Sequence, residues 1–439
     1  MDVLYDTRHE TQERLWSGSS LRTANVLTQA RIYPDVRVAY TEKTISIANQ
    51  SSSSFWQEEA LYTFYLPEGS VVSSLSLWIN GVEEKSYLTT RSKADSAYRT
   101  IVGREARDPS VAHWQEGNTV KVKVFPCTSR ENRKFKIGIT SPLKLDRESL
   151  VYENSWFKGP GASDANETIR IEFPENTVPP QLPFDTTTSG SGFMVYEGKY
   201  QSSWNVRFKL MPLTHDIFSF DGKSYALEPL VQTPDNFRAE AFYLDINQSW
   251  TKDDLDTLWP LVKDRPVFVA DERLIRLTSA NKDELFKTLS TFHFSIFPTH
   301  QIPHPETALL VTKSGPLSPT LHELDKSPFA KMLSRSNGPA VRAFIIGDEP
   351  SPYIKSLDEL RIIRGEKTDW QKLKGFIAKH QFPADPEKDP SVIRIDESKT
   401  LIREIDGVAN GQAPDHLLRL FAYNHIMKQI GGHYLDQSF

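Results

Sequence analysis

The sequence of 439 residues contains one cysteine, Cys127, and therefore cannot form an internal disulfide. It lacks any apolar run of the roughly 18 to 20 residues that a membrane helix requires, and it does not open with a basic segment followed by an apolar one. Neither sign of charge dominates, because 52 Lys and Arg residues face 57 Asp and Glu residues. These absences exclude a disulfide-stabilised fold and make nucleic acid an unexpected partner. We expect a soluble piece of protein, with any membrane anchor outside this chain.

Apolar side chains are plentiful enough to build packed cores. Hydrophobic residues make up 38% of the chain and aromatic residues 11%, which is too much for a disordered protein. At roughly 100 to 200 residues per domain, the length predicts two or three domains.

The first part of the chain, to about Leu230, is rich in short runs in which apolar and polar residues alternate. Such alternation gives a strand one buried and one exposed face, as in antiparallel sandwiches. A short helix is expected at 91–102, where apolar residues recur three or four positions apart. The clearest strands are predicted at 36–40, 44–47, 120–124 and 135–139.

From about Asp235 onward, strand-like runs alternate with helical ones. This pattern is typical of a parallel sheet with helices on both faces. The strands are expected at 239–244, 267–270, 308–312, 343–346 and 392–395.

Three helix starts carry recognisable signals. Asn281 with Glu284, and Ser356 with Glu359, have the spacing of a capping box, in which two side chains satisfy the free N–H groups of a helix start. A last helix is expected from Asp415, directly after a proline.

These patterns together predict a multidomain chain in which a β-rich sandwich is followed by a doubly wound α/β domain. We place a lead segment at 1–30, the β-rich domain at 31–150, its β-rich extension at 151–234, the α/β domain at 235–400 and a C-terminal helical segment at 401–439.

One series of motifs runs through the β-rich part in a fixed order. It consists of Glu59–Gly69 (EALYTFYLPEG), Trp78–Gly81 (WING), Arg107–Pro109 (RDP), Trp114, Gly117–Asn118 (GN), Val124–Pro126 (VFP) and Arg133. In order and spacing the series resembles the VIT domain of inter-alpha-trypsin heavy chains and vault proteins. It departs from the family at 111–113, where the family often carries leucines and an acidic residue. We interpret the series as architectural, because it holds no paired acid and base and no set of metal ligands.

A second resemblance begins at Asp245, directly after an expected strand. The run DINQS from Asp245 to Ser249 is similar to the D-x-S-x-S run of von Willebrand A domains, with Asn247 in the place of the first serine. In that family the run holds a divalent metal at the carboxyl end of a parallel strand, and a second loop adds a threonine, for which Thr299 lies suitably. The resemblance implies a metal site made of Asp245, Asn247, Ser249 and Thr299.

The last element of that site is altered. The family carries an acid directly after a later strand, and here Lys313 stands in that place, after the strand expected at 308–312. An ammonium group at this position would repel the ion, and it could pair with Asp245 instead. We therefore expect a degenerate site without an ion, and hence no cofactor, with Mg²⁺ as the alternative.

Two further candidate sites are weaker. His300 and His304 are four residues apart, but Pro303 and Pro305 exclude the helix that would aim both at one metal, so we expect a solvated loop. Ser191 lies in a G-S-G sequence that is not a turn from a strand to a helix, as a nucleophile elbow requires.

The chain as a whole resembles bacterial exosortase-associated VIT-domain proteins. The resemblance implies a place on the periplasmic or extracellular side of the cell envelope and a part in protein sorting. We expect a non-enzymatic interaction or scaffold protein with protein partners. Two alternatives stay open: a metal-ion-dependent adhesion protein, which Lys313 disfavours, and an envelope hydrolase or transferase, which the lack of a recognisable nucleophile with its base disfavours.

Overall fold

The computed structural model describes residues 19–52, 57–86, 110–115, 118–175, 177, 180–186, 188–313, 315, 317–324, 327–334, 339–347, 349–411 and 413–430. The described chain forms two compact units. One, here called the α/β unit, comprises Gln232–Asp385 and the end of the last helix from His425. The other, the β unit, joins the chain up to Val231 with Pro386–Asn424. The expectation of a β-rich, multidomain chain is therefore confirmed.

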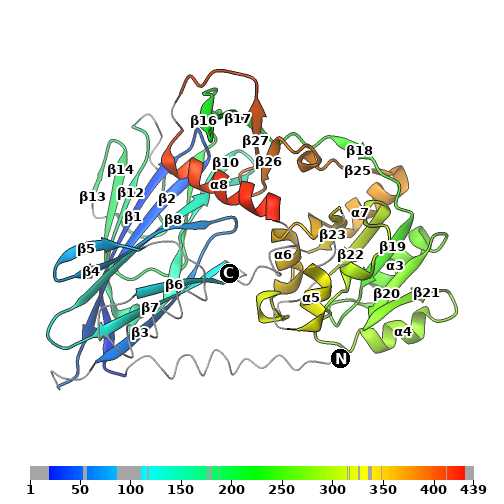
Figure 1. Cartoon of the computed structure of the whole chain (residues 1–439), viewed down its shortest axis with the longest axis horizontal. Coiled ribbons are helices and arrows are strands. Elements are labelled where there is room, and N and C mark those ends of the chain that lie inside the picture. Colours follow the sequence, from blue (N-terminus) through cyan, green and yellow to red (C-terminus); the bar gives the residue numbers. More distant parts are fainter. Residues whose placement is uncertain are drawn as a thin grey trace. The chain divides into compact units, whose positions relative to one another are not determined.

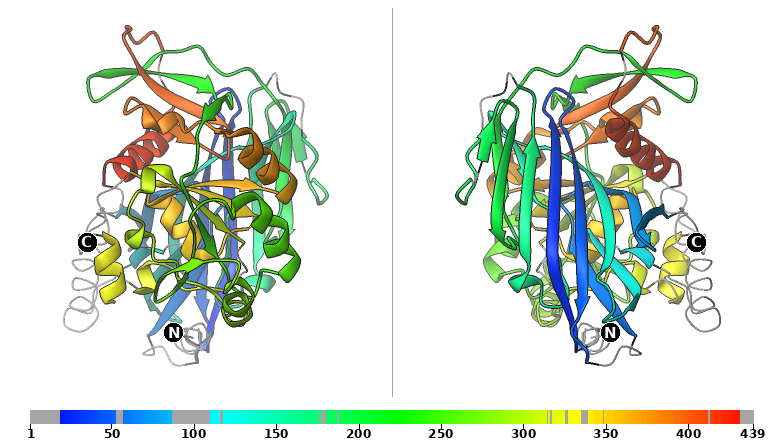
Figure 2. Two further views of the ribbon diagram at one scale, coloured as in Figure 1. Left: turned by 90° about the vertical axis from the view of Figure 1, so that its right-hand side faces the viewer. Right: turned by 90° about the vertical axis from the view of Figure 1, so that its left-hand side faces the viewer.

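The β unit is built on an eight-stranded sheet (Figures 1 and 2). The order of its strands is β13 (Thr188–Gly190), β14 (Phe193–Lys199), β12 (Asn166–Glu172), β1 (Leu21–Tyr33), β2 (Val38–Asn49), β8 (Arg133–Pro142), β4 (Val71–Ile79) and β5 (Val82–Lys85). All neighbours are antiparallel except β1 and β12, which pair in parallel from Asn25 with Asn166 to Arg31 with Glu172. The right-hand view of Figure 2 shows β1 in the middle of this sheet.

A second, four-stranded sheet shares a core with the first. Its order is β11 (Trp156–Lys158), β3 (Glu58–Tyr65), β7 (Thr119–Cys127) and β6 (Ser110–Gln115). Tyr62 and Phe64 on β3 are fully buried, and their ring centroids lie 5.1 and 6.3 Å from that of Phe135 on β8. The motif residues on β3 therefore fill the core between two sheets, because alternate side chains of a strand point to one face.

The turn that follows β3 depends on a glycine. Gly69 has a φ of +71°, and a Cβ atom there would lie 2.6 Å from Glu397 Oε2. Any other residue would meet both a left-handed backbone and a close neighbour, which explains the P-E-G sequence at this strand end.

A buried ion pair crosses the middle of the eight-stranded sheet. Lys43 Nζ on β2 donates to Thr28 Oγ1 on β1 (2.8 Å) and lies 3.7 Å from Glu167 Oε1 on β12, with both charged side chains fully buried. Thr28 Oγ1 in turn donates to Glu167 Oε1 at 2.7 Å. Burial lowers the pKa of Lys43, and the Glu167 charge opposes that shift. An unpaired buried charge costs several kcal/mol. These three side chains therefore require β2, β1 and β12 to lie side by side.

Two smaller sheets complete the β unit. One consists of β15 (Asn205–Lys209), β10 (Ser149–Glu153) and β9 (Lys144–Asp146), and a short 3₁₀ turn, η2 (Ala162–Asp164), precedes β12. The other consists of β16 (Phe218–Phe220), β17 (Lys223–Pro229), β27 (Thr400–Ile405) and β26 (Val392–Ile395). Helix α8 (Asp415–Ile430) buries Leu417, Leu420 and Phe421 in the same hydrophobic cluster as this sheet.

The α/β unit contains a six-stranded sheet in the order β21 (Arg273–Leu277), β20 (Val267–Asp271), β19 (Ala241–Asp245), β22 (Ala308–Thr312), β23 (Val341–Ile346) and β24 (Ile363–Thr368). All its pairs are parallel except β20 with β21. A small ribbon of β18 (Pro234–Asn236) and β25 (Gln381–Pro383) stands apart from this sheet, and η4 (Pro305–Thr307), η5 (His322–Leu324) and η6 (Pro386–Lys388) are single turns along the described chain.

Helices cover both faces of the six-stranded sheet (Figure 1). Phe242 and Leu244 of β19 belong to a cluster with α3 (Lys252–Val262), α4 (Lys282–Leu289) and α7 (Trp370–Lys379), whereas Tyr243 belongs to a cluster with α5 (Pro328–Ser334) and α6 (Pro352–Glu359). Successive residues of one strand thus pack against helices on opposite faces of the sheet. Because both faces are buried, the sequences of these strands are continuously apolar.

The observed boundaries differ from the predicted ones in three places. The run Val392–Ile395 forms β26 of the β unit and not a strand of the parallel sheet, so the α/β unit ends at Asp385 instead of 400. The segment 401–439 is not a separate helical segment, because β27 pairs with β17. Residues 21–30 are part of β1 and not of a lead segment.

Two helix starts also differ in detail. Asn281 precedes α4 as predicted, but its side chain accepts from Thr278 and not from the helix start. Helix α6 begins at Pro352, where Ser351 accepts from the N–H of Ile354, and Ser356 lies inside the helix. The helix predicted at 91–102 and the motif residues 107–109 lie outside the described residues.

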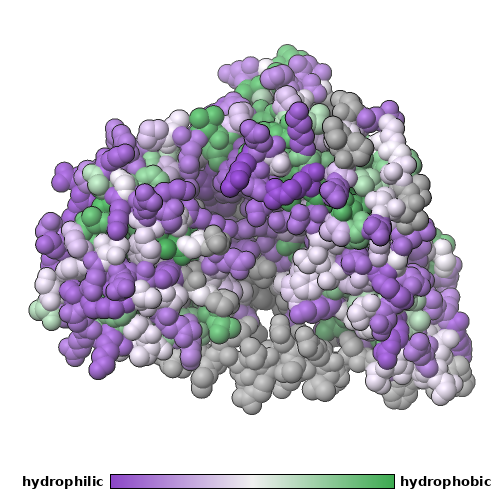
Figure 3. Space-filling model, turned by 180° about the vertical axis from the view of Figure 1, so that it is seen from behind, coloured by the Kyte–Doolittle hydropathy of each residue, from purple (hydrophilic) through white to green (hydrophobic). Residues whose placement is uncertain are grey.

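The surface carries few large hydrophobic side chains. Those that are exposed in the described chain come from separate elements: Leu27, Val82, Val231, Leu317, Met332, Val408 and Ile426. Hydrophilic residues dominate the face shown in Figure 3. No helix in the described ranges combines the length and apolar character needed to cross a membrane.

A cavity-forming substitution in the core of one unit should lower the stability of that unit alone. Leu310 on β22 and Leu150 on β10 are both fully buried, in clusters that belong to different units. Leu310→Ala and Leu150→Ala should each lower the free energy of unfolding of one unit by about 2 to 5 kcal/mol. Differential scanning calorimetry should show each variant moving one of two transitions. A single transition that both variants shift equally would refute separate cores.

Candidate functional site at the carboxyl end of the parallel sheet

The predicted site lies where β19 and β22 end side by side. Asp245 is the last residue of β19 and pairs in register with Thr312, the last residue of β22. Because β19 and β22 are parallel neighbours, the loops that follow them leave from the same edge of the sheet. The chain after β19 runs through Asn247 and Ser249 to Thr251, which caps α3.

The Asp245 carboxylate is buried and fully engaged. Its side chain is 2% exposed, and Thr312 Oγ1 donates to Oδ2 at 2.7 Å. The other oxygen, Oδ1, accepts from the hydroxyl of Ser295, which lies in the loop before η3 (Thr299–Gln301). Burial raises the pKa of Asp245 to about 6, although the two hydroxyl hydrogen bonds oppose the rise. Both oxygens that a metal would need are thus committed to protein donors.

Asn247 and Ser249 extend this network. Asn247 Oδ1 accepts from the backbone N–H of Ser249 at 2.9 Å, and its Nδ2 donates to Ser295 Oγ at 3.2 Å. The Ser249 hydroxyl lies 2.6 Å from Asn247 Oδ1 and also contacts the carbonyl oxygen of Lys313, so its single proton serves one acceptor at a time. The structure therefore brings Asp245, Asn247 and Ser249 together through Ser295.

Thr299 is buried close to this loop but is not part of the network. It is 4% exposed, and its Oγ1 has no hydrogen-bond partner in the described chain. Ser295, four residues earlier in the same loop, makes the contact with Asp245 that the family pattern had suggested for a threonine. The sequence shows two hydroxyl residues in this loop, Ser295 and Thr299, but only the fold shows that Ser295 reaches the carboxylate of Asp245.

Lys313 pairs with Asp254 and not with Asp245. Its Nζ lies 2.6 Å from Asp254 Oδ2 at the start of α3, where Asp254 also forms a capping box with Thr251. Burial by itself would raise the pKa of Asp254, but hydrogen bonds from Lys313 and from Thr251 outweigh it and hold that pKa below its usual value. The predicted pairing of Lys313 with Asp245 is wrong, because both oxygens of Asp245 already have hydroxyl donors.

The other candidate residues do not form a site. His304 is exposed beside Glu306, whereas His300 packs its ring edge-on against Phe329 with a centroid distance of 5.3 Å. Ser191 lies in the turn between β13 and β14, which is a hairpin and not a strand-to-helix turn. In the described part of the chain, no group of three His, Cys, Asp or Glu residues could hold a metal ion.

Comparison with known proteins identifies one domain. Residues 29–139 match the family described as Vault protein inter-alpha-trypsin domain, so the chain contains a VIT domain, as its motifs predicted. The match covers about a quarter of the chain, within the β unit. No curated protein matches the sequence.

Solved structures that align with the chain are distant. Leukotriene A4 hydrolase from Saccharomyces cerevisiae is 7% identical with a TM-score of 0.26, over 72% of this chain and 44% of that one. The M1 zinc metallopeptidase from Deinococcus radiodurans is 11% identical with a TM-score of 0.25, over 73% of this chain and 64% of that one. The collagen adhesin of S. aureus is 13% identical with a TM-score of 0.19, over 30% of this chain and 42% of that one. The chain thus spans less than two thirds of these proteins, and their scores support no inference about fold or activity.

The raised pKa of Asp245 predicts a pH-dependent stability of the α/β unit. The pKa of this carboxyl is about 4 in the unfolded chain and about 6 in the folded one. The protonated carboxyl therefore stabilises the folded state fully below about pH 4, and this stabilisation is lost as the pH rises to about 6. Asp245→Asn carries no charge to bury, so at pH 7 its free energy of unfolding should exceed that of the wild type by about 2 to 3 kcal/mol, with a higher melting temperature, whereas at pH 4 the two should be equal.

Asp256→Asn is the matched control, because Asp256 is an exposed carboxylate on α3 whose pKa Lys252 lowers. This variant should not gain stability at pH 7. Thermal melts of the wild type and both variants between pH 4 and 7 test the prediction, and an equal gain for Asp245→Asn at both pH values would contradict it.

Proposed function

We propose that this protein is a non-enzymatic interaction protein of a bacterial cell envelope, in which a VIT-containing β unit carries an inserted von Willebrand A-like domain that works without a metal ion. The observation that supports it best is the engagement of both Asp245 oxygens by Ser295 and Thr312. A site that satisfies its own carboxylate has no open position for an ion or for a ligand bound through one.

The topology of the α/β unit supports the A-like assignment. Its first strand, β19, lies between β20 and β22, and the third strand, β21, is an antiparallel edge. The D-x-N-x-S run follows this first strand at the carboxyl edge, which is where ligands bind in sheets of this kind. A domain of this topology offers its edge loops to partners as a rigidly supported surface.

Charge at this edge supports independence from metal. The single carboxylate of the run, Asp245, is buried and has a raised pKa, and the ammonium of Lys313 is paired with Asp254. A divalent ion would have to displace two hydroxyl donors and approach the carbonyl of Lys313. A partner that docks here would instead meet side-chain amides, hydroxyls and a neutralised ion pair.

The envelope location and the link to an exosortase system follow from the resemblance of the whole chain to exosortase-associated VIT-domain proteins. The presence of a VIT domain together with an A-like domain whose ion site is altered supports that grouping. An exosortase gene next to the gene for this protein would support the system assignment, and its absence in related genomes would count against it.

Metal independence gives the sharpest test of this proposal. The unfolding midpoint of the wild type should be the same in Mg²⁺, in Mn²⁺ and in EDTA, because no ion binds the folded state preferentially. Isothermal titration with Mg²⁺ should release no heat of binding. A midpoint that rises with Mg²⁺ and falls back with EDTA would instead favour a metal-ion-dependent adhesion protein.

Two variants calibrate this experiment. Lys313→Asp restores the acid that the A-domain pattern carries at this position and should gain detectable Mg²⁺ binding. Lys313→Asn removes the same positive charge without adding a carboxylate and should not gain it. Partner capture from an envelope extract should give equal recovery with Mg²⁺ and with EDTA.

A further inference from the structure

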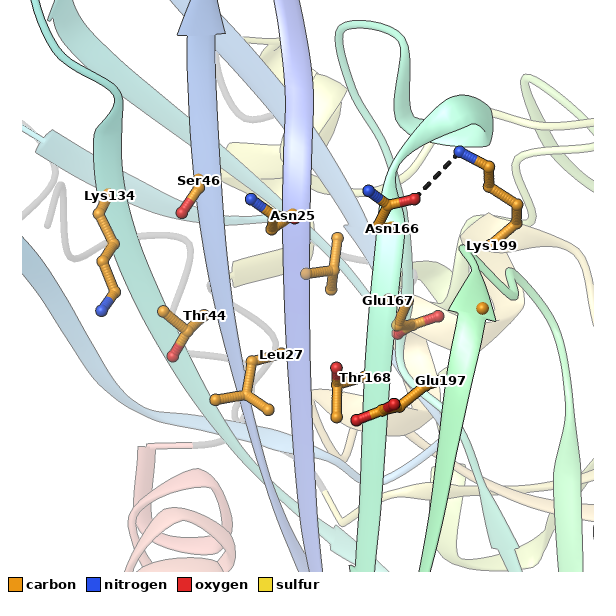
Figure 4. Close-up of a pocket in the computed structure, with 12 residues that line it drawn as sticks. Asn25, Leu27, Thr44, Ser46, Lys134, Asn166, Glu167, Thr168, Glu197 and Lys199 are labelled. Atoms are coloured by element: carbon orange, nitrogen blue, oxygen red, sulfur yellow. Dashed lines mark hydrogen bonds between the residues drawn. The ribbon is translucent and has the colours of Figure 1, made fainter. Parts of the chain in front are cut away.

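A trough on the outer face of the eight-stranded sheet is built differently from the rest of that face. It has a volume of about 670 Å³ and is lined mainly from β2, β1, β12 and β14. Figure 4 shows its side chains standing on neighbouring strands around Leu27, which is 37% exposed. The volume is within the range of about 300 to 1,000 Å³ typical of ligand sites.

The strand register explains why this region is hollow. Two rows of paired residues cross the sheet, each with short side chains at its three middle positions and long charged ones at its ends. The rows span four strand spacings, or ~19 Å. The first row is Lys134, Ser46, Asn25, Asn166 and Lys199, and the second is Lys136, Thr44, Leu27, Thr168 and Glu197.

The next row limits the trough along the strands. There Gln29 pairs with Glu42 on one side and with Arg170 on the other, so long side chains occupy the middle of the sheet. The short residues are thus confined to two rows. At the row of Gln29 the trough ends, so it does not continue along the strands as a channel.

Four polar side chains inside the trough are neutral and make no hydrogen bond to the described chain. In the described chain, no protein group hydrogen-bonds the side chains of Asn25, Thr44, Ser46 or Thr168. The hydrogen bond drawn in Figure 4 runs from Lys199 Nζ to Asn166 Oδ1, at 3.1 Å. Hydroxyl and amide side chains both donate and accept, so these four present a mixed hydrogen-bonding surface.

The charged side chains at the end of the second row and beyond the two rows are occupied by ion pairs. Lys136 Nζ lies 2.7 Å from Glu83 and 3.6 Å from Glu42, and Glu172 accepts from both Arg31 and Arg170. Charged side chains that neutralise one another leave little capacity for a ligand. The contrast marks the trough as the part of the face where hydrogen-bonding capacity is left unused.

We propose that this trough binds a neutral carbohydrate chain. Sugar hydroxyls match the alternating donors and acceptors of Asn25, Thr44 and Thr168, and the apolar face of a sugar ring can rest on the exposed Leu27. Among the described residues that line the trough, the exposed charges are those of Lys134, Lys199 and Glu197 at its rims, whereas Glu167 is buried and paired with Lys43. A uniformly anionic chain therefore has no matching field.

Other ligands fit the trough less well. An extended peptide usually adds to the open edge of a sheet, but β2, β1 and β12 have neighbours on both sides and their backbone groups are already paired. Single-stranded nucleic acid requires aromatic side chains on which bases stack, and none lines the trough.

The test is binding of soluble neutral polysaccharides, a glucan, a mannan and a galactan, to the full chain by affinity electrophoresis and isothermal titration. A polyuronate serves as the charged comparator. At least one neutral polymer should bind, and Thr44→Lys and Thr168→Lys, which fill the trough, should each weaken binding at least about tenfold. Thr168→Ser keeps the hydroxyl and should retain binding.

The matched control is Gln29→Lys, which adds the same side chain to the same face on β1, outside the trough. It should bind as the wild type does, and thermal melts should show that all variants are folded. The proposal is overturned if no neutral polymer binds, if the polyuronate alone binds, or if both Thr→Lys variants bind as well as Gln29→Lys. None of these outcomes depends on the metal independence of the α/β unit.

Discussion

The pairing of β17 with β27 is the constraint on which the organisation of the chain depends. It joins Ser224 with Ile405 and Pro229 with Thr400, although the α/β unit of residues 232–385 lies between them in sequence. Directly before β27, the buried Arg37 Nη1 donates to the carbonyl oxygens of Ser398 at 2.8 Å and of Lys399 at 3.3 Å. Burial lowers the pKa of Arg37. The α/β unit is consequently an insertion whose two ends leave from neighbouring strands.

Buried polar groups are satisfied in two different ways in the two units. In the β unit, Lys43 and Glu167 neutralise each other and share Thr28, which ties three strands of one sheet. In the α/β unit, the buried Asp245 carboxylate is stabilised by the hydroxyls of Ser295 and Thr312, which only partly offset the rise in its pKa caused by burial. The first arrangement specifies which strands lie together, because a shifted register would leave a charge unpaired. The second joins Asp245 at the end of β19 to Thr312 at the end of β22 and to Ser295 in a separate loop.

Every strand run predicted from local patterns overlaps an observed strand, because apolar residues in a strand show which of its faces are buried, but many other strands of the described chain were not predicted individually. Val120–Val124 and Phe135–Ile139 alternate and lie in β7 and β8, as expected. The run Val392–Ile395 was misassigned because all four residues are buried, and a fully covered antiparallel strand has the same apolar sequence as a parallel one. The run DINQS was selected as a candidate site from residue types and spacing alone. Its actual partners, Ser295 for Asp245 and Asp254 for Lys313, depend on where separate loops meet, which no local pattern encodes.

The insertion also determines how the chain would carry tension. Lys223 and Ile405 enter and leave the β17–β27 ladder at the same end, whereas the inserted α/β unit is attached at the other. A pull on the flanking chain would therefore open the ladder one hydrogen bond at a time, starting from Ser224 and Ile405. The two connections to the inserted residues 232–385 would carry no load along the chain until the last pair, Pro229 and Thr400, had separated. The ladder would therefore protect these two connections from weak force.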